Sequence, residues 1–103
     1  MLEPITLNKR DQRYLDRLLD GQHKEMLDDL VWRSNLFLRA IEEEVDWVDT
    51  YQYEKHRVFE CINGKHYELR YIQDNYRGER IKLDFYEVVP KEITKIVYER
   101  KEN

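Results

Sequence analysis

The sequence predicts a single α+β domain in which two N-terminal helices pack on one face of a three- or four-stranded antiparallel sheet. Three observations lead to this expectation. Apolar residues recur every three or four positions over residues 8–48, which is the period of a helix. Over residues 51–100 the period is two, as in strands, and an Asn63-Gly64 pair separates two such runs. The length of 103 residues suits one domain with one core.

The first helix is expected over about residues 9–20. Asn8 can cap its first turn, with Asp11 at the third position, and Gly21 can end it in the left-handed conformation. Its apolar residues are Tyr14, Leu15, Leu18 and Leu19.

A longer second helix is expected over about residues 24–46, because eight apolar residues of this stretch fall on one arc at 100° per residue. They are Met26, Leu27, Leu30, Val31, Phe37, Leu38, Ile41 and Val45.

The strongest local pattern predicts a hairpin over residues 57–72. Asn-Gly suits a two-residue type I′ turn, which would pair Ile62 with Lys65 and Val58 with Leu69. The face expected to cover the helices then holds Val58, Ile62, Tyr67, Leu69 and Tyr71. A further strand is expected over residues 80–89, ended by Pro90. Residues 92–100 favour a fourth strand over a helix, although both patterns fit.

Composition excludes several kinds of chemistry. The three glycines stand apart, so no phosphate-binding loop is expected, and the one serine, Ser34, lies within a helical pattern. The predicted register brings Cys61 opposite His66. We interpret them as a small apolar residue beside a polar one on a half-exposed sheet face, rather than as a reactive thiol–imidazole pair. Glu42 and Asp46 are better explained as a solvated helix surface than as cation ligands. We therefore expect no cofactor and no metal.

Asp84 and a Glu99-x-Lys101 triplet could place a metal ion and a water on neighbouring strands, as in a metal-dependent nuclease. Such triplets arise by chance in a chain that is 39% charged.

Compartment and origin follow from composition alone. The single cysteine cannot form an internal disulfide, and neither an apolar leader nor an 18-residue apolar run is present. We expect a cytoplasmic protein that does not enter membranes. Its high content of Glu, Arg, Lys, Ile and Val is typical of hyperthermophile proteins. The composition fits equally well a small protein that is encoded by a virus or mobile element and made in a host cell.

Residues 1–54 carry 13 acids and 7 bases, whereas residues 55–103 carry 9 acids and 11 bases. In the second half, Arg70, Arg77, Arg80 and Lys82 lie among tyrosines and could contact nucleic acid. The helices followed by Tyr67-Glu68-Leu69-Arg70-Tyr71 and a further β-run resemble the layout of the small ribonuclease toxins of toxin–antitoxin pairs. That resemblance implies RNA cleavage by a basic fold, whereas the pI here is about 5.4.

The expected second helix carries apolar residues opposite its core face. Trp32, Leu36 and Ala40 would follow one another by one turn, with Trp47 nearby. Beside them lies a run of acids that includes Glu43 and Asp46. The stripe could be core between the first helix and the sheet, or an exposed surface for a partner or a second copy. We expect a small non-enzymatic interaction protein, dimeric or bound to a protein partner, that acts through this acidic and aromatic surface. The alternative is a nucleic-acid-binding protein or small nuclease that uses the sheet half.

Overall fold

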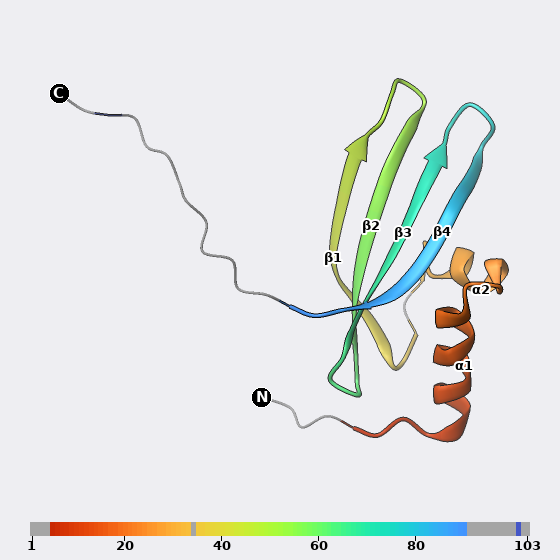
Figure 1. The fold of residues 1–103 in the computed structure, drawn as a ribbon, viewed down its shortest axis with the longest axis vertical. Helices are drawn as coiled ribbons and strands as arrows, with labels where there is room; N and C mark the ends of the chain where they lie inside the picture. The colour runs from red at the N-terminus through yellow and green to blue at the C-terminus, as the bar shows by residue number, and fades with distance from the viewer. Residues whose placement is uncertain (1–4, 34, 91–100, 102–103) are drawn as a thin grey trace.

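A computed structural model describes residues 5–33, 35–90 and 101 of the chain. In this part, two helices precede four strands (Figure 1). The elements are α1 (Lys9–Asp20), α2 (Lys24–Asp29), β1 (Leu38–Trp47), β2 (Gln52–Cys61), β3 (His66–Asp74) and β4 (Glu79–Val88). The strands form one antiparallel sheet in the order β1-β2-β3-β4, so each strand pairs with its neighbour in sequence. The expectation of an α+β chain with an antiparallel sheet is confirmed.

Helix α1 begins and ends where its capping residues predict. The Asn8 side chain accepts a hydrogen bond of 2.8 Å from the backbone N–H of Asp11, and Gly21 takes the left-handed conformation with φ of 77°. Leu15 and Leu18 are buried. Local capping and periodicity were therefore sufficient to define this helix.

The predicted second helix over residues 24–46 is wrong in extent, because α2 ends at Asp29 and residues 38–47 form strand β1. The apolar residues of this stretch fit one arc at the period of a helix, and this local pattern suggested one. In the folded chain, β1 instead pairs with β2 from Leu38 opposite Cys61 to Trp47 opposite Tyr53, and this tertiary pairing overrides the local preference. The fourth strand of the sheet thus precedes the hairpin. The strand expected over residues 92–100 lies outside the described residues.

The hairpin between β2 and β3 exists, but its turn contains three residues, Ile62, Asn63 and Gly64. The N–H of Cys61 donates to the carbonyl of Lys65 over 2.9 Å, and Gly64 has a φ of 86°, as the left-handed position of a three-residue loop requires. The two-residue type I′ turn expected from Asn-Gly is therefore wrong.

This longer turn shifts the predicted pairing by one residue. Leu69 lies opposite Arg57, and Tyr67 lies opposite Phe59. A shift of one residue moves every side chain of a strand to the other face, so Phe59 and Cys61 enter the core in place of Val58 and Ile62. The predicted face of β3, with Tyr67, Leu69 and Tyr71, is the buried one.

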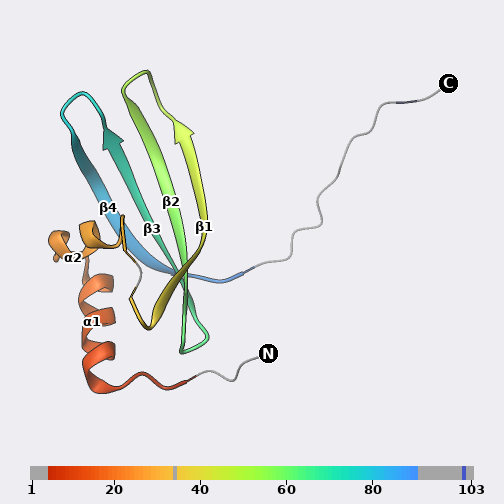
Figure 2. The ribbon, with the colours of Figure 1, turned by 180° about the vertical axis from the view of Figure 1, so that it is seen from behind.

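One cluster of buried side chains joins helices and sheet. Leu15 and Leu18 of α1 and Leu27 of α2 belong to the same cluster as Phe59 and Leu69. Both helices lie beside the sheet near β4, and the turns that join β1 to β2 and β3 to β4 lie at the end of the sheet away from α1 (Figures 1 and 2).

Two aspartates shape the turns at this end. Asp49 accepts hydrogen bonds from the backbone N–H groups of Tyr51 and Gln52, and Asp74 accepts from those of Tyr76 and Arg77. The Gln52 amide also donates to Asp74 over 3.2 Å. The backbone bonds from Arg77 and Tyr76 and the bond from Gln52 hold the pKa of Asp74 below its ordinary value, although its desolvation opposes this shift.

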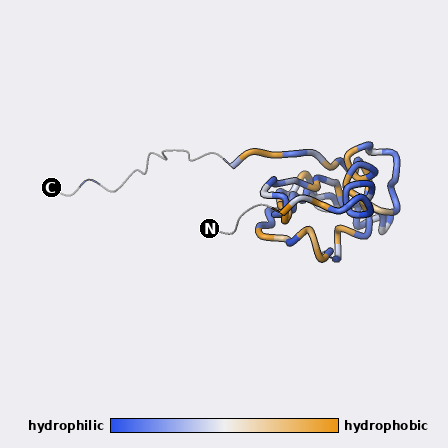
Figure 3. The backbone as a smooth tube through the Cα atoms, turned by 90° about the horizontal axis from the view of Figure 1, so that it is seen from below, coloured by the Kyte–Doolittle hydropathy of each residue, from blue (hydrophilic) through white to orange (hydrophobic). Residues whose placement is uncertain are grey.

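Hydrophobic and hydrophilic stretches alternate along the chain (Figure 3). Among the described residues, no helix has the length and apolar character needed to cross a membrane.

Candidate interaction surface

Strand β1 lies at one edge of the sheet, and its two faces differ in chemistry. Glu42, Glu44 and Asp46 lie on the face that also carries His56 and Glu54, and we call these three residues the acidic row. The alternate residues of β1 lie on the face that carries the core. Alternation along a strand thus separates charge from apolar surface.

Val45 and Trp47 provide the apolar surface of the edge. Their exposed fractions are 48% and 64%, and the Trp47 ring meets the Tyr53 ring edge to face at 5.2 Å. At the same end of the sheet, Tyr51 and Tyr76 meet at 5.8 Å. Exposed aromatic rings held by neighbouring rings are typical of binding surfaces, because they lose little conformational freedom on contact.

Glu43 differs from the acidic row. Its carboxylate lies 2.9 Å from Arg57 Nε and 3.5 Å from Lys55 Nζ. Arg57 also donates to the carbonyl of Leu30, so Glu43 belongs to a contact that joins the sheet to the segment after α2. No ion pair within the described residues involves the acidic row itself. Of the predicted acids, Asp46 is therefore available to a partner and Glu43 is engaged.

The stripe predicted from Trp32, Leu36 and Ala40 is not a helix face. Trp32 lies in the turn after α2, Leu36 lies in the segment before β1, and Ala40 lies on β1 packed against the core cluster. Trp32 is 71% exposed, and the guanidinium of Arg80 lies over its ring at 5.2 Å. Leu36 is fully exposed. The stripe required one continuous helix, which the chain does not form.

The four basic residues proposed for nucleic acid do not all lie on one surface, although Arg70 and Lys82 line one small pocket. Arg70 forms an ion pair with Glu54 on the face of the acidic row. Arg80 lies on the core side and donates two hydrogen bonds to Asp28 of α2, one of them 2.8 Å long. Arg77 lies 3.9 Å from Glu79 in the β3–β4 turn. The fourth, Lys82, is exposed and has a φ of 54° at the β4 bulge. Arg70 and Arg80 are thus paired with acids of the same chain, on opposite faces of the sheet.

Behind the acidic row lies a polar network centred on His56. Its ring nitrogens lie 3.1 Å from a Glu54 oxygen and 3.0 Å from a Glu68 oxygen, and the Tyr86 hydroxyl donates to Glu68. Hydrogen bonding to Arg70 lowers the pKa of Glu54, and burial raises the pKa of Tyr86 to about 12. Each polar group of this network thus meets a hydrogen-bonding or oppositely charged partner.

The other candidate chemistry is not assembled. Cys61 is buried opposite Lys65, its pKa is raised by desolvation, and His66 pairs instead with Glu60. No group of three His, Cys, Asp or Glu side chains in the described part of the chain could hold a metal ion. Ser34 and Glu99 lie outside the described residues.

Comparison with protein-family models, curated proteins and solved structures finds no match to this chain.

Two features escaped the sequence reasoning. The edge position of β1 was missed because residues 38–47 were assigned to a helix, although their acids at positions 42, 44 and 46 alternate with apolar Val45 and Trp47. The second feature is a group of cations on α1, at positions 9, 10, 13 and 17, which the acidic total of the N-terminal half concealed.

Proposed function

We propose that this chain is a small non-enzymatic interaction protein whose strand β1 binds a basic, extended segment of a protein partner by strand addition. The observation that carries the proposal is the edge itself. β1 has one sheet neighbour among the described residues, β2, and along residues 42–47 its other edge offers backbone donors and acceptors beside the acidic row. A partner strand would gain main-chain hydrogen bonds there, and its side chains would meet one acidic and one apolar face.

The alternation of β1 specifies the partner's sequence pattern. Lysine or arginine at every second position would meet Glu42, Glu44 and Asp46, and apolar residues between them would lie against Val45 and Trp47. A second copy of β1 is a poor partner at this edge, because pairing would bring the acidic rows together, and like charges on facing strands are destabilising. The acids therefore discourage self-pairing of the edge while favouring a basic strand.

The proposal includes a finer account of the fold. We infer that α1 and α2 pack on the face that carries Phe59 and Leu69, which leaves the opposite face and the β1 edge accessible. Support comes from Leu15, Leu18 and Leu27, which share one buried cluster with those two sheet residues.

A synthetic ten-residue peptide of alternating lysine and valine tests the proposal. We expect saturable binding that weakens as salt rises, because exposed charges are screened. The double variant Glu44→Gln, Asp46→Asn should weaken binding about three- to tenfold, as expected for two exposed ion pairs, mainly through slower association. The matched control Glu25→Gln, Asp29→Asn removes the same charge from α2 and should bind as the wild type does.

A peptide of the same composition with its lysines in one block separates strand addition from general attraction. Alternating peptide should protect backbone amides of β1 from hydrogen exchange, and block peptide should not. Equal binding of both peptides, or equal loss in both double variants, would show that net charge alone is responsible.

A further inference from the structure

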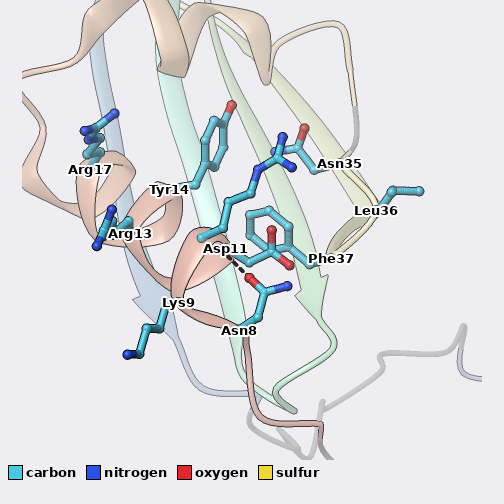
Figure 4. A pocket seen from close by; sticks show the side chains of 10 residues that line it. Asn8, Lys9, Asp11, Arg13, Tyr14, Arg17, Asn35, Leu36 and Phe37 are labelled. Carbon is cyan, nitrogen blue, oxygen red and sulfur yellow. Dashed lines mark hydrogen bonds between the residues drawn. The ribbon is translucent and has the colours of Figure 1, made fainter.

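A cleft of about 870 Å³ lies between α1 and the segment at residues 35–37, away from β1's acidic row. Figure 4 shows Tyr14 of α1, Asn35 and Phe37 gathered around it, whereas the side chains of Arg13 and Arg17, further along the helix, extend away from Asn35 and Phe37. Its volume falls in the range of pockets that bind small molecules. The cleft is formed by residues that the proposed partner strand does not contact.

The charge of this cleft is opposite to that of the whole chain. Lys9, Arg10, Arg13 and Arg17 line it, against one acid, Asp11, whereas the chain carries a net charge of −4. None of these four cations forms an ion pair with another described residue. Arg70 and Arg80 of the sheet, by contrast, form ion pairs. An external anion could therefore neutralise cations that have no ion pair within the described part of the chain.

Two neutral features add to the charge. The side-chain nitrogen of Asn35 is buried and has no hydrogen-bond acceptor among the residues that the structure describes. A buried donor without a partner is costly, which indicates that an acceptor belongs there. The ring of Tyr14 meets that of Phe37 edge to face at 5.8 Å, so the same cleft offers an aromatic wall.

We propose that this cleft binds a phosphorylated small molecule that carries an aromatic ring, of the nucleoside-diphosphate class. Helical spacing puts Arg10, Arg13 and Arg17 within one arc of α1, and their long side chains would turn towards the cleft to share an anion of two or more charges. The ring would lie against Tyr14, and the buried Asn35 side chain would turn towards the cleft so that its Nδ2 donates to an oxygen of the ligand. Several arginines favour a diphosphate over a single carboxylate, and they replace the glycine-rich loop that the chain lacks.

Calorimetric titration with adenosine diphosphate tests this inference. We expect one saturable site, with adenosine and inorganic pyrophosphate each at least about tenfold weaker, because each lacks one half of the contacts. The variant Arg10→Gln, Arg13→Gln should weaken binding about tenfold or more, as loss of hydrogen bonds between charged groups predicts. The control Arg39→Gln, Arg77→Gln removes equal charge from exposed positions outside the cleft and should bind as the wild type does.

Nuclear magnetic resonance gives a readout independent of affinity. Adenosine diphosphate should shift the side-chain amide signal of Asn35 and the amides of α1, and Asn35→Leu should weaken binding while the protein stays folded. Three results would overturn the inference: no saturable binding at millimolar nucleotide, equal weakening by the control variant, or pyrophosphate binding as tightly as the nucleotide. The last would reduce the cleft to a site for simple anions.

Discussion

Neighbouring acids on β1 have different functions because their side chains alternate between faces. Glu43 points to the side of Arg57 and Lys55, whose side chains are 12% and 21% exposed, and it forms ion pairs with both. Glu44, one residue on, lies on the opposite face without an ion pair in the described part of the chain. Residue type and position in the sequence do not distinguish these two glutamates, whereas strand geometry does.

Replacing these glutamates one at a time tests the distinction. Glu43→Gln should lower the free energy of unfolding by about 0.5–1 kcal/mol, as for a partly exposed ion-pair network. Glu44→Gln should leave it within about 0.5 kcal/mol of the wild type, as for a surface change. Urea unfolding followed by circular dichroism measures both. An equal loss in the two variants would show that Glu43 has no special structural contact.

Asp74 predicts how the protein responds to acid. Its pKa is held low by the backbone N–H groups of Arg77 and Tyr76 and by Gln52, so its carboxylate stabilises the fold fully above the ordinary pKa of 3.8. That contribution is lost as pH falls below this value. Asp74→Asn should therefore be less stable than the wild type at pH 7, and the difference should shrink towards pH 2. A constant difference from pH 7 to pH 2 would assign the effect to shape rather than charge.

At the scale of elements, the sequence was most informative where structure depends on neighbouring residues. Helix α1 was predicted to the residue from Asn8 and Gly21, and the alternation of β3 predicted its buried face. The failures involve contacts between distant segments. Residues 38–47 form a strand because β2 lies beside them. The pairing register of the β2–β3 hairpin, which decides the face that each side chain takes, depends on how the turn fits its surroundings.

The hairpin register makes a prediction that reverses the one from sequence. Phe59→Ala should cost about 3–5 kcal/mol, because Phe59 is buried and packs near Phe85. Val58→Ala should cost about 1 kcal/mol or less, since Val58 lies on the opposite, partly exposed face. Guanidinium unfolding of the two variants measures both. The opposite ranking would support the two-residue turn.

The candidate surface could be predicted only in composition. The sequence identified Asp46, Trp47 and their acidic surroundings as unusual, but it placed them on a helix with Trp32 and Leu36. The structure separates those residues and puts the acids on a sheet edge. A helix surface and a strand edge recognise different partners, so the correct element was needed to specify the binding mode.

At the scale of the whole molecule, opposite charges occupy separate regions. The acidic row lies on β1, whereas the cations at positions 9, 10, 13 and 17, which form no ion pair with a described residue, lie on α1, which contacts β4. Such separation allows two ligands of opposite charge to bind without competing for a surface.

Self-association remains a prediction at this scale. If the exposed Leu36 contributes to a dimer, light scattering at high micromolar concentration should give a mass near twice 12.9 kDa. Leu36→Glu should then return the mass to that of one chain with an unchanged circular dichroism spectrum, because the side chain is fully exposed. A wild-type mass of 12.9 kDa would exclude the dimer.

The three-residue turn also has a consequence for the order of folding. Its additional residue, Ile62, donates its N–H to the carbonyl of Phe37 over 3.1 Å and accepts from the N–H of Ile5 over 2.7 Å. Both contacts span long stretches of chain, whereas the hairpin closes locally and loses less loop entropy. We therefore expect the β2–β3 hairpin to form early. The segments that contain Phe37 and Ile5 should then attach to its turn later in folding.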